Sequence, residues 1–369
     1  MSLKKNIGLV YLLLPYITPA KNKIGLIFSI LFSSNYTLKL KNKFTIEFNS
    51  SQFEHLMNIL GILTFATSYE IKTKNELEFS LDIKNKFTIK VKDMSYEDYN
   101  ILELFFGGIR YGANFVHNNI NSENFRDKTL KILEKDDRKI VETSNGIKFY
   151  IDSIHPGNTI IETFLREIHK INSQKKWDNR IVVDVGAECG DTPLYFASMG
   201  ATVYAFEPIE EHFKFMLENI KLNPSLKDKI VPINGAIGRD EILTFYQSGD
   251  GIVGNTSFVK NLHGSNVKEI KAKGYSLETA LREFNIKKID FLKMDCKGCE
   301  FLLTENALEN VDSLKIEYTN NFDKTQTLSQ LLDTLERSGF EYMTFSHNPM
   351  YHQSFQNITN VYGKKNKKY

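Results

Sequence analysis

The stretch Arg180-Ile181-Val182-Val183-Asp184-Val185-Gly186-Ala187-Glu188-Cys189-Gly190-Asp191-Thr192-Pro193 decides the fold of this chain. Its first half is an apolar run closed by an acid, which is typical of a central parallel strand buried on both faces. Its second half is a glycine-containing turn, after which Leu194 and Tyr195 begin a helix. Glycines allow a ligand close to the backbone, and the free amide groups at a helix start face such a ligand. The stretch therefore predicts a strand, a ligand-binding turn and a helix.

A second acid follows at the end of the next predicted strand. Thr202 to Phe206 runs into Glu207-Pro208, and Glu207 stands 23 residues after Asp184. A carboxylate about 20 residues beyond a glycine turn, at the end of the neighbouring strand, is where a ribose is held through its hydroxyls. A nicotinamide dinucleotide is the competing ligand. It is disfavoured because Gly186 and Gly190 are four residues apart and the G-x-G-x-x-G pattern is missing.

These motifs resemble class I S-adenosylmethionine-dependent methyltransferases, and specifically the FkbM family. Asp184 to Thr192 is similar to the family's D-x-G-A-N-x-G-D-T turn, and Phe206-Glu207-Pro208 to its acidic strand end. Lys293 to Glu300 resembles its later K-x-D-x-E-G-x-E segment, and Val231 to Gly238 its third strand and adenine-side loop. The resemblance covers residues 145 to 362 in the correct order and leaves out the N-terminal part.

The resemblance implies an α/β domain of the class I methyltransferase type, with a seven-stranded sheet, helices on both faces and S-adenosylmethionine as its cofactor. Two positions depart from the family's pattern, since Glu188 replaces its usual Asn and Lys297 its usual Glu. The resemblance implies that the following residues bind the cofactor: Asp184, Gly186, Ala187, Glu188, Gly190, Asp191, Thr192, Glu207, Pro208, Asn234, Ala236 and Asp295.

Methyl transfer from a sulfonium is an in-line displacement, so alignment of the acceptor accounts for much of the rate. A hydroxyl acceptor must also lose its proton, and a positioned base assists this step. We expect Asp295 to face the methyl group, Lys297 to orient an anionic acceptor or steady the developing oxyanion, and Glu317 to be the next catalytic candidate. His155 is a more distant one. For Lys297, Glu317 and His155, a surface or ion-paired role is an equally open interpretation.

The three cysteines are Cys189 in the glycine turn and the C-x-x-C pair Cys296 and Cys299. The pair raises the question of a zinc or redox site. However, the chain has no second C-x-x-C and no spaced histidine pair, so a closed four-ligand zinc site lacks ligands. We therefore expect small buried thiols and no metal.

The first third of the chain contains a repeat. Lys41 to Ile46 reads Lys-Asn-Lys-Phe-Thr-Ile and recurs at Lys84 to Ile89, a period of 43 residues. In each copy two alternating stretches flank the Lys-Asn-Lys turn, which is the pattern of a hairpin. A helix with a capping pair follows, Ser51 with Glu54 or Ser95 with Asp98. Two such units could form one sheet covered by two helices.

We accordingly divide the chain into residues 1–140 and 141–369. The first domain is predicted to be a duplicated strand-strand-helix α+β domain, with a structural, oligomerisation or substrate-platform role and a charged helical linker at Asn121 to Lys139. The second is predicted to be the methyltransferase domain. A chain of 369 residues is long enough for both.

Composition narrows the function classes. A net charge of +2 disfavours a nucleic-acid partner, and three cysteines fit a reducing, cytoplasmic location. The apolar run Ile7 to Ile17 is too short to span a bilayer and is read as a buried N-terminal element. The function predicted from the resemblance is O-methylation of a small-molecule or glycan hydroxyl, with possible homo-oligomer formation through the first domain. The alternatives are a non-catalytic cofactor-binding or assembly protein, and an RNA or protein methyltransferase.

Overall fold

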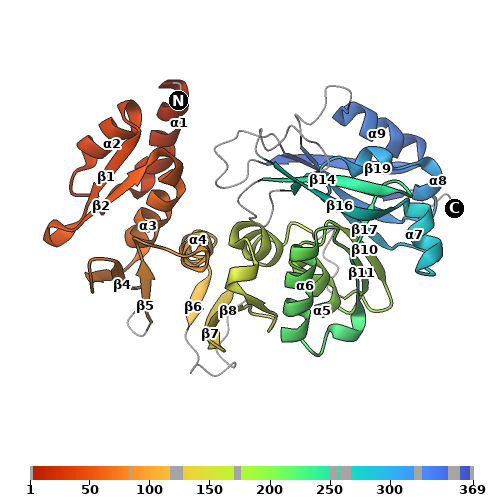
Figure 1. The fold of residues 1–369 in the computed structure, drawn as a ribbon, viewed down its shortest axis with the longest axis horizontal. Coiled ribbons are helices and arrows are strands. Elements are labelled where there is room, and N and C mark those ends of the chain that lie inside the picture. Colours follow the sequence, from red (N-terminus) through yellow and green to blue (C-terminus); the bar gives the residue numbers. More distant parts are fainter. Residues whose placement is uncertain are drawn as a thin grey trace. The chain divides into compact units, whose positions relative to one another are not determined.

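The computed structural model describes residues 3–82, 85–116, 128–169, 176–248, 256–257, 267–319, 326–347 and 358–365. The chain forms two compact units, and many of their elements are labelled in Figure 1. One unit comprises residues 1–146, 150–152 and 156–161, and the other 147–149, 153–155 and 162–369. Within the part of the chain described, no helix is both long and apolar enough to cross a bilayer.

The second unit is built on a seven-stranded sheet in the order β12-β11-β10-β17-β18-β20-β19. Its first five strands are parallel, and β20 runs antiparallel to both of its neighbours. This mixed order confirms the predicted class I methyltransferase sheet. In chain order the strands are β10 (Ile181–Val185), β11 (Thr202–Phe206), β12 (Ile230–Ile233), β17 (Phe291–Met294), β18 (Ser313–Thr319), β19 (Phe340–His347) and β20 (Ile358–Lys365).

Five α-helices and a smaller sheet complete this unit in the described residues. The helices are α5 (Asp191–Ser198), α6 (Glu210–Leu222), α7 (Leu277–Glu283), α8 (Glu305–Leu308) and α9 (Leu328–Arg337). The smaller sheet has the order β13-β16-β14-β15, with β13 (Ala236–Ile237), β14 (Ile242–Ser248), β15 (Thr256–Ser257) and β16 (Val267–Tyr275). The main core joins buried side chains of β10, β17 and β18 to those of α7, α8 and α9. The central strands are buried on both faces, as their apolar sequences predict.

The first unit contains the two expected hairpin-and-helix units. Strands β1 and β2 pair antiparallel and precede α3, and β4 and β5 pair antiparallel and precede α4. Asn42 in the first turn has a positive φ of 56°. The expected capping pair Ser95 with Asp98 is present at the start of α4, whereas Asn49 and Gln52 take that role before α3 in place of Ser51 and Glu54.

The elements of this unit are α1 (Leu3–Leu13), α2 (Lys23–Phe32), α3 (Phe53–Phe65), α4 (Tyr96–Arg110), β1 (Asn35–Lys39), β2 (Thr45–Asn49), β3 (Ser68–Ile71), β4 (Glu76–Ser80), β5 (Lys86–Lys90), β6 (Asn114–Val116), β7 (Thr129–Lys135) and β8 (Arg138–Glu142). Strand β9 (Lys148–Tyr150) lies where the chain passes to the second unit.

Three expectations for the N-terminal part are wrong. The two copies do not share one sheet, because β1-β2 form one sheet and β3-β4-β5 another, while α3 and α4 pack together. The run Ile7 to Ile17 is only partly buried, since Leu9 and Leu13 face the core and Tyr11 is 71% exposed. The charged segment Asn121 to Lys139 is not a helix in its described part, because β7 and β8 form a hairpin there; residues 121–127 lie outside the described residues.

Candidate active site at the carboxyl edge of the sheet

The glycine turn is shaped by close protein neighbours. Gly186 has a φ of +81°, and a Cβ added there would lie 2.4 Å from the carbonyl oxygen of Asp295. Gly190 has a φ of +87°, and its added Cβ would lie 2.9 Å from Cγ of Met216 on α6. Both positions therefore require glycine because of backbone conformation and packing. The sequence reading, which assigned these glycines to ligand approach alone, missed this physical reason.

Glu207 fastens the turn to the neighbouring strand. It follows β11, is 4% exposed, and accepts hydrogen bonds of 2.8 Å from the backbone N–H groups of Glu188 and Ile209 through its two oxygens. Burial raises the pKa of Glu207 to about 8, although these two N–H groups act to lower it. A carboxylate offers about four lone-pair sites, so each oxygen keeps room for a hydroxyl donor. This pair of acceptors fits the two hydroxyls of a ribose.

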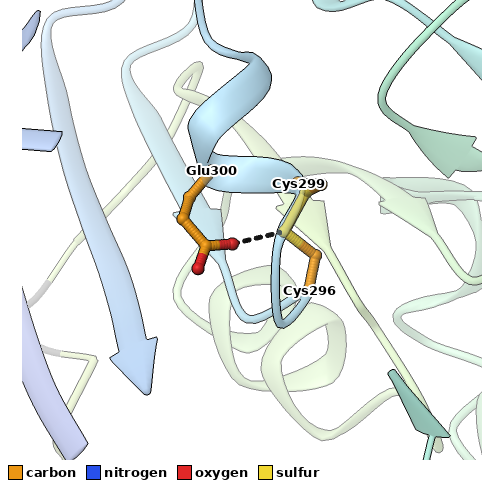
Figure 2. A group of neighbouring side chains, drawn as sticks. All are labelled: Cys296, Cys299 and Glu300. Carbon is orange, nitrogen blue, oxygen red and sulfur yellow. Dashed lines mark hydrogen bonds between the residues drawn. A yellow bond between two sulfur atoms is a disulfide. The ribbon is translucent and has the colours of Figure 1, made fainter. Parts of the chain in front are cut away.

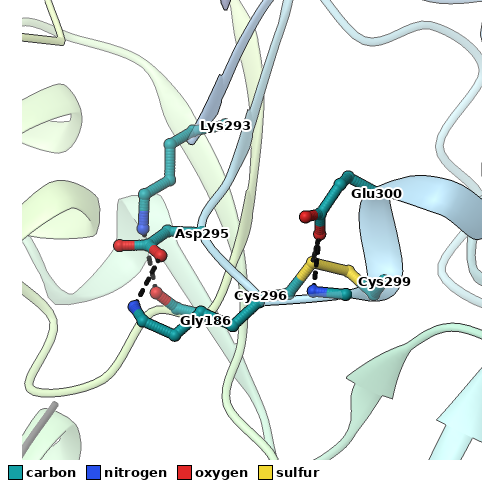
Figure 3. Close-up of a disulfide and its surroundings, with 8 residues drawn as sticks. Gly186, Lys293, Asp295, Cys296, Cys299 and Glu300 are labelled. Carbon is teal, nitrogen blue, oxygen red and sulfur yellow. Dashed lines mark hydrogen bonds and ion pairs between the residues drawn. A yellow bond between two sulfur atoms is a disulfide. The ribbon is translucent and has the colours of Figure 1, made fainter. Parts of the chain in front are cut away.

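Asp184, one of the predicted cofactor residues, lies near the end of β10, beneath the turn. It is fully buried and forms a 2.9 Å ion pair with Lys293 of β17. Lys293 also donates a 2.9 Å hydrogen bond to the carbonyl oxygen of Gly186 (Figure 3). Burial raises the pKa of Asp184 to about 6, and Lys293 acts against that rise. The pair joins the central two strands to the turn. Sequence reasoning did not assign Lys293 a role, although a lysine inside the apolar strand Phe291–Met294 signals a buried partner.

Asp295 and Lys297 form an ion pair at the end of β17. The Lys297 ammonium lies 3.0 Å from Oδ1 of Asp295, and the side chains are 24% and 30% exposed, respectively. Burial acts to raise the pKa of Asp295, but the Lys297 and Lys293 ammonium groups outweigh it and lower the pKa to about 2. Lys297 itself has a positive φ of 51°. The structure thus brings together two of the three predicted catalytic residues as a partly exposed pair.

The remaining predicted catalytic residue, Glu317, lies on β18 and is half-buried. Burial raises its pKa, and Asp295 raises it further, while Lys297 acts in the opposite direction. Glu317 is therefore electrostatically coupled to the Asp295 and Lys297 pair. His155 is near enough to Glu188 to lower the pKa of that carboxyl, against a larger effect of burial that raises it to about 7.

The other predicted cofactor residues surround the same turn. Asn234 donates a 3.0 Å hydrogen bond to the carbonyl oxygen of Glu207, which ties the end of β12 to the end of β11. Asp191, at the start of α5, accepts a 2.6 Å hydrogen bond from the hydroxyl of Thr163, and burial raises its pKa. Pro208 lies beside Asn234, whereas Ala187, Thr192 and Ala236 are buried.

A buried polar network behind Asp191 was missed by sequence reasoning. The hydroxyl of Thr163 lies 3.1 Å from Nε2 of His169, and the ammonium of Lys315 lies 3.3 Å from Nδ1 of the same ring. Burial holds the pKa of His169 well below its usual range, and Lys315 lowers it further. The residues of this network come from separated parts of the sequence, so no local sequence motif predicts it.

A family comparison identifies the domain that carries this site. Residues 184–342 match the family model described as the methyltransferase FkbM domain. This stretch is therefore identified as a methyltransferase FkbM domain. The match confirms the resemblance drawn from Asp184 to Thr192, and it does not extend to the N-terminal unit. A search of curated proteins finds no match to the chain.

The solved structures described next are similar to this chain but distant from it in sequence. A fibrillarin pre-rRNA processing protein from Methanococcus jannaschii is 14% identical, with a TM-score of 0.36 over 81% of this chain and 98% of the other. TYW2 from M. jannaschii, in complex with AdoMet, is 15% identical, with a TM-score of 0.33 over 66% of this chain and 89% of the other. An rRNA methylase from Streptococcus thermophilus is 13% identical, with a TM-score of 0.34 over 52% and 90%. The identification of the FkbM domain therefore rests on the family match over residues 184–342.

Cys296 and Cys299 of the FkbM domain are joined in a disulfide, as Figure 2 shows. The expectation of free thiols is therefore wrong for this pair, while Cys189 is a free buried cysteine as expected. The C-x-x-C spacing brings the two sulfurs within bonding distance because the chain turns back at Lys297 and Gly298, which both have positive φ. The bridge closes the loop that carries Lys297.

Glu300 lies beside this disulfide. Its carboxyl is 1% exposed, accepts a 2.8 Å hydrogen bond from the N–H of Gly298, and lies 3.4 Å from the sulfur of Cys296 (Figure 2). Burial raises its pKa to about 7. The possible metal-ligand atoms of Cys296, Cys299 and Glu300 lie within 4.8 Å of one another. Zinc binds cysteine as the thiolate, which a disulfide does not offer, so we assign no metal to this group.

Proposed function

We propose that the FkbM domain transfers a methyl group from S-adenosylmethionine to a hydroxyl of a small molecule or glycan. The observation that carries this proposal is the partly exposed Asp295 and Lys297 pair at the carboxyl end of β17, beside the glycine turn. Ligands of open parallel sheets bind at this edge. The family match supports methyl transfer as the reaction class.

The cofactor supplies an electrophilic methyl group on a sulfonium. The carboxylate of Glu207 is proposed to accept hydrogen bonds from its ribose hydroxyls, a role supported by the position of Glu207 at the end of β11. Glu188 lies in the glycine turn, where a negative charge would favour the sulfonium and oppose the methionine carboxylate. Because its pKa is raised to about 7, Glu188 carries only part of that charge at neutral pH. This reconciles a carboxyl at this position with cofactor binding.

The acceptor hydroxyl needs a base. A carboxylate whose pKa is about 2 accepts a proton poorly, so Asp295 serves better as a fixed charge facing the methyl group. Glu317 has a raised pKa and is therefore the stronger base of the two. Lys297 would orient an anionic acceptor or stabilise the developing oxyanion. In this assignment the ion pair positions the acceptor and Glu317 takes the proton.

The proposal extends to the type of acceptor, the cellular location and the self-association of the protein. The net charge of +2 disfavours RNA as the acceptor. A cytoplasmic location and self-association through the N-terminal unit remain predictions, which cell fractionation and light scattering test. The disulfide between Cys296 and Cys299 counts against a reducing compartment. A non-catalytic cofactor-binding protein is the alternative that the departures at Glu188 and Lys297 favour.

Calorimetric titration with S-adenosylmethionine and S-adenosylhomocysteine separates these possibilities. Binding of both is expected, and binding of neither would exclude the enzyme. A screen of lysate metabolites and glycans with labelled cofactor then identifies the acceptor. Lys297→Met should abolish most methyl transfer while cofactor affinity stays within a few-fold, whereas exposed Lys287→Met should match the native protein. Cofactor binding without transfer to any acceptor would favour the non-catalytic alternative.

A further inference from the structure

The positive charge of the chain is concentrated at its N-terminus. Residues 1–46 contain seven lysines and no arginine, aspartate or glutamate. The whole chain has 47 basic and 45 acidic residues, so the part after residue 46 is net negative. Because no acid lies in this segment, its lysines up to Lys39 have no neighbouring countercharge in the sequence. A surface built from it attracts anions.

The same segment exposes much of the apolar surface of the molecule. Among the described residues, thirteen large hydrophobic side chains are exposed, and seven of them lie on α1, α2 or the turn after α1. They are Ile7, Tyr11, Leu12, Leu14, Ile24, Phe28 and Phe32. Single exposed hydrophobic side chains are ordinary, but a cluster of this size marks an interaction surface.

Helix α2 presents three of these side chains on one face. Ile24, Phe28 and Phe32 are four residues apart and are 74%, 59% and 70% exposed. The rings of Phe28 and Phe32 are 5.9 Å apart, while Leu26 and Ile30 on the opposite face are fully buried. Helical spacing puts residues four apart on the same side. The helix is therefore apolar on both its core-facing and its exposed side.

The side chain of Asn22 ties the start of α2 to β1, and a lysine stands on either side of Asn22. The side chain of Asn22 accepts a 2.9 Å hydrogen bond from the N–H of Lys39 and donates one of 2.7 Å to the carbonyl oxygen of Thr37. Lys21 and Lys23 flank Asn22, and both are exposed. Two ammonium groups therefore lie at the end of an exposed apolar face whose orientation is fixed within this unit.

We propose that the apolar face of α2, formed by Ile24, Phe28 and Phe32, docks onto an anionic lipid bilayer, with Lys21 and Lys23 at the level of the headgroups. Membrane-interface segments bury apolar side chains such as phenylalanine at the boundary of headgroups and acyl chains, and nearby lysines add electrostatic attraction to anionic lipids. Protein interfaces instead favour arginine and are poor in lysine, the reverse of this segment. Nucleic-acid sites stack bases on aromatic rings beside basic groups, whereas four of the seven exposed side chains of this segment are aliphatic and offer no stacking surface. The chemistry therefore favours lipid over either macromolecule.

Co-sedimentation of the full chain with vesicles tests this inference. One set of vesicles is phosphatidylcholine alone, and the other is equal parts phosphatidylcholine and phosphatidylglycerol. We expect binding only to the anionic set, weakening as salt is added. Lys21→Gln with Lys23→Gln should weaken binding about 25-fold, at about fivefold per lysine. The matched control changes the exposed Lys227 and Lys287 of the other unit and should leave binding unchanged.

The triple change Ile24→Ser, Phe28→Ser and Phe32→Ser should reduce vesicle binding by about tenfold or more. Its control, Met343→Ser with Phe345→Ser, removes side chains of the second unit that are 73% and 60% exposed, and it should leave vesicle binding unchanged. Far-ultraviolet circular dichroism, which records the helices of both units, confirms that each variant is folded. Equal binding to neutral vesicles, loss of binding on addition of single-stranded RNA, or a concentration-dependent dimer that the triple variant dissolves would each overturn the proposal.

Discussion

Removing the carboxyl of Glu207 is expected to loosen the glycine turn before it affects the cofactor. In Glu207→Ala the N–H groups of Ile209 and Glu188 both lose their acceptor. The first is buried, which costs about 1 to 3 kcal/mol, and the second is part-buried, which costs about 1 kcal/mol. The total of about 2 to 4 kcal/mol is a large share of the ~5 to 15 kcal/mol that stabilises a domain. The alanine variant therefore tests folding.

Glu207→Gln separates this structural role from the proposed ribose contact. The amide keeps one acceptor oxygen, so the expected loss of unfolding free energy is about 1 to 2 kcal/mol. Above pH 8, where Glu207 is ionised, a ribose hydroxyl exchanges a charge-assisted bond for a neutral one in this variant, which should weaken S-adenosylhomocysteine binding about 5- to 30-fold at that pH. Exposed Glu210→Gln, three residues along the chain, is the matched control and should change neither quantity.

Urea unfolding followed by the fluorescence of the single tryptophan, Trp177, measures the stability of the FkbM unit, and calorimetry measures cofactor affinity. An unfolding midpoint of Glu207→Ala equal to that of the native protein would refute the role of Glu207 in holding the turn. A folded Glu207→Gln variant that binds S-adenosylhomocysteine as tightly as the native protein would refute the ribose assignment.

Three further outcomes follow from the same geometry. Because burial raises the pKa of Glu207 from 4.5 to about 8, the folded state binds its proton more tightly than the unfolded state does. Its contribution to stability is complete below pH 4.5 and is lost as pH rises through 8, so the urea midpoint should fall over that range, and less so in Glu207→Gln. Gly186→Ala should lower the free energy of unfolding by more than about 3 kcal/mol, since the added Cβ meets the carbonyl oxygen of Asp295. Gly339 has the same φ of +81° but open space around it, so Gly339→Ala should lower the free energy of unfolding by about 1 kcal/mol. Equal unfolding midpoints of the two variants would count against the packing argument. Asp295→Asn should lower the rate of methyl transfer at least tenfold and lower the pKa of Glu317, seen as a shift of the pH–rate profile to lower pH; an unmoved profile would remove Glu317 as the base.

Local sequence was sufficient for the strand, turn and helix around Gly186. The buried run Ile181–Val185, the two glycines and the acid at the end of the next strand are signals within one stretch of chain, and each reflects a backbone or burial requirement of that stretch. The seven-stranded order then follows from the family resemblance, and the sheet confirms it. The repeated hairpin-and-helix pattern was also readable, because turn residues and alternation are local properties.

Partnerships between distant residues were decided only by the tertiary structure. Asp184 and Lys293 are over a hundred residues apart in sequence, yet they meet because β10 and β17 are parallel neighbours. The same holds for Gly186, which needs to be glycine because the carbonyl of Asp295 lies against it. The two hairpin units of the first third have similar sequences but separate sheets, since strand pairing between units depends on packing that neither repeat encodes. Sequence thus determined the elements and the cofactor edge, while folding determined which charges are paired, which glycines are forced and which apolar faces stay exposed.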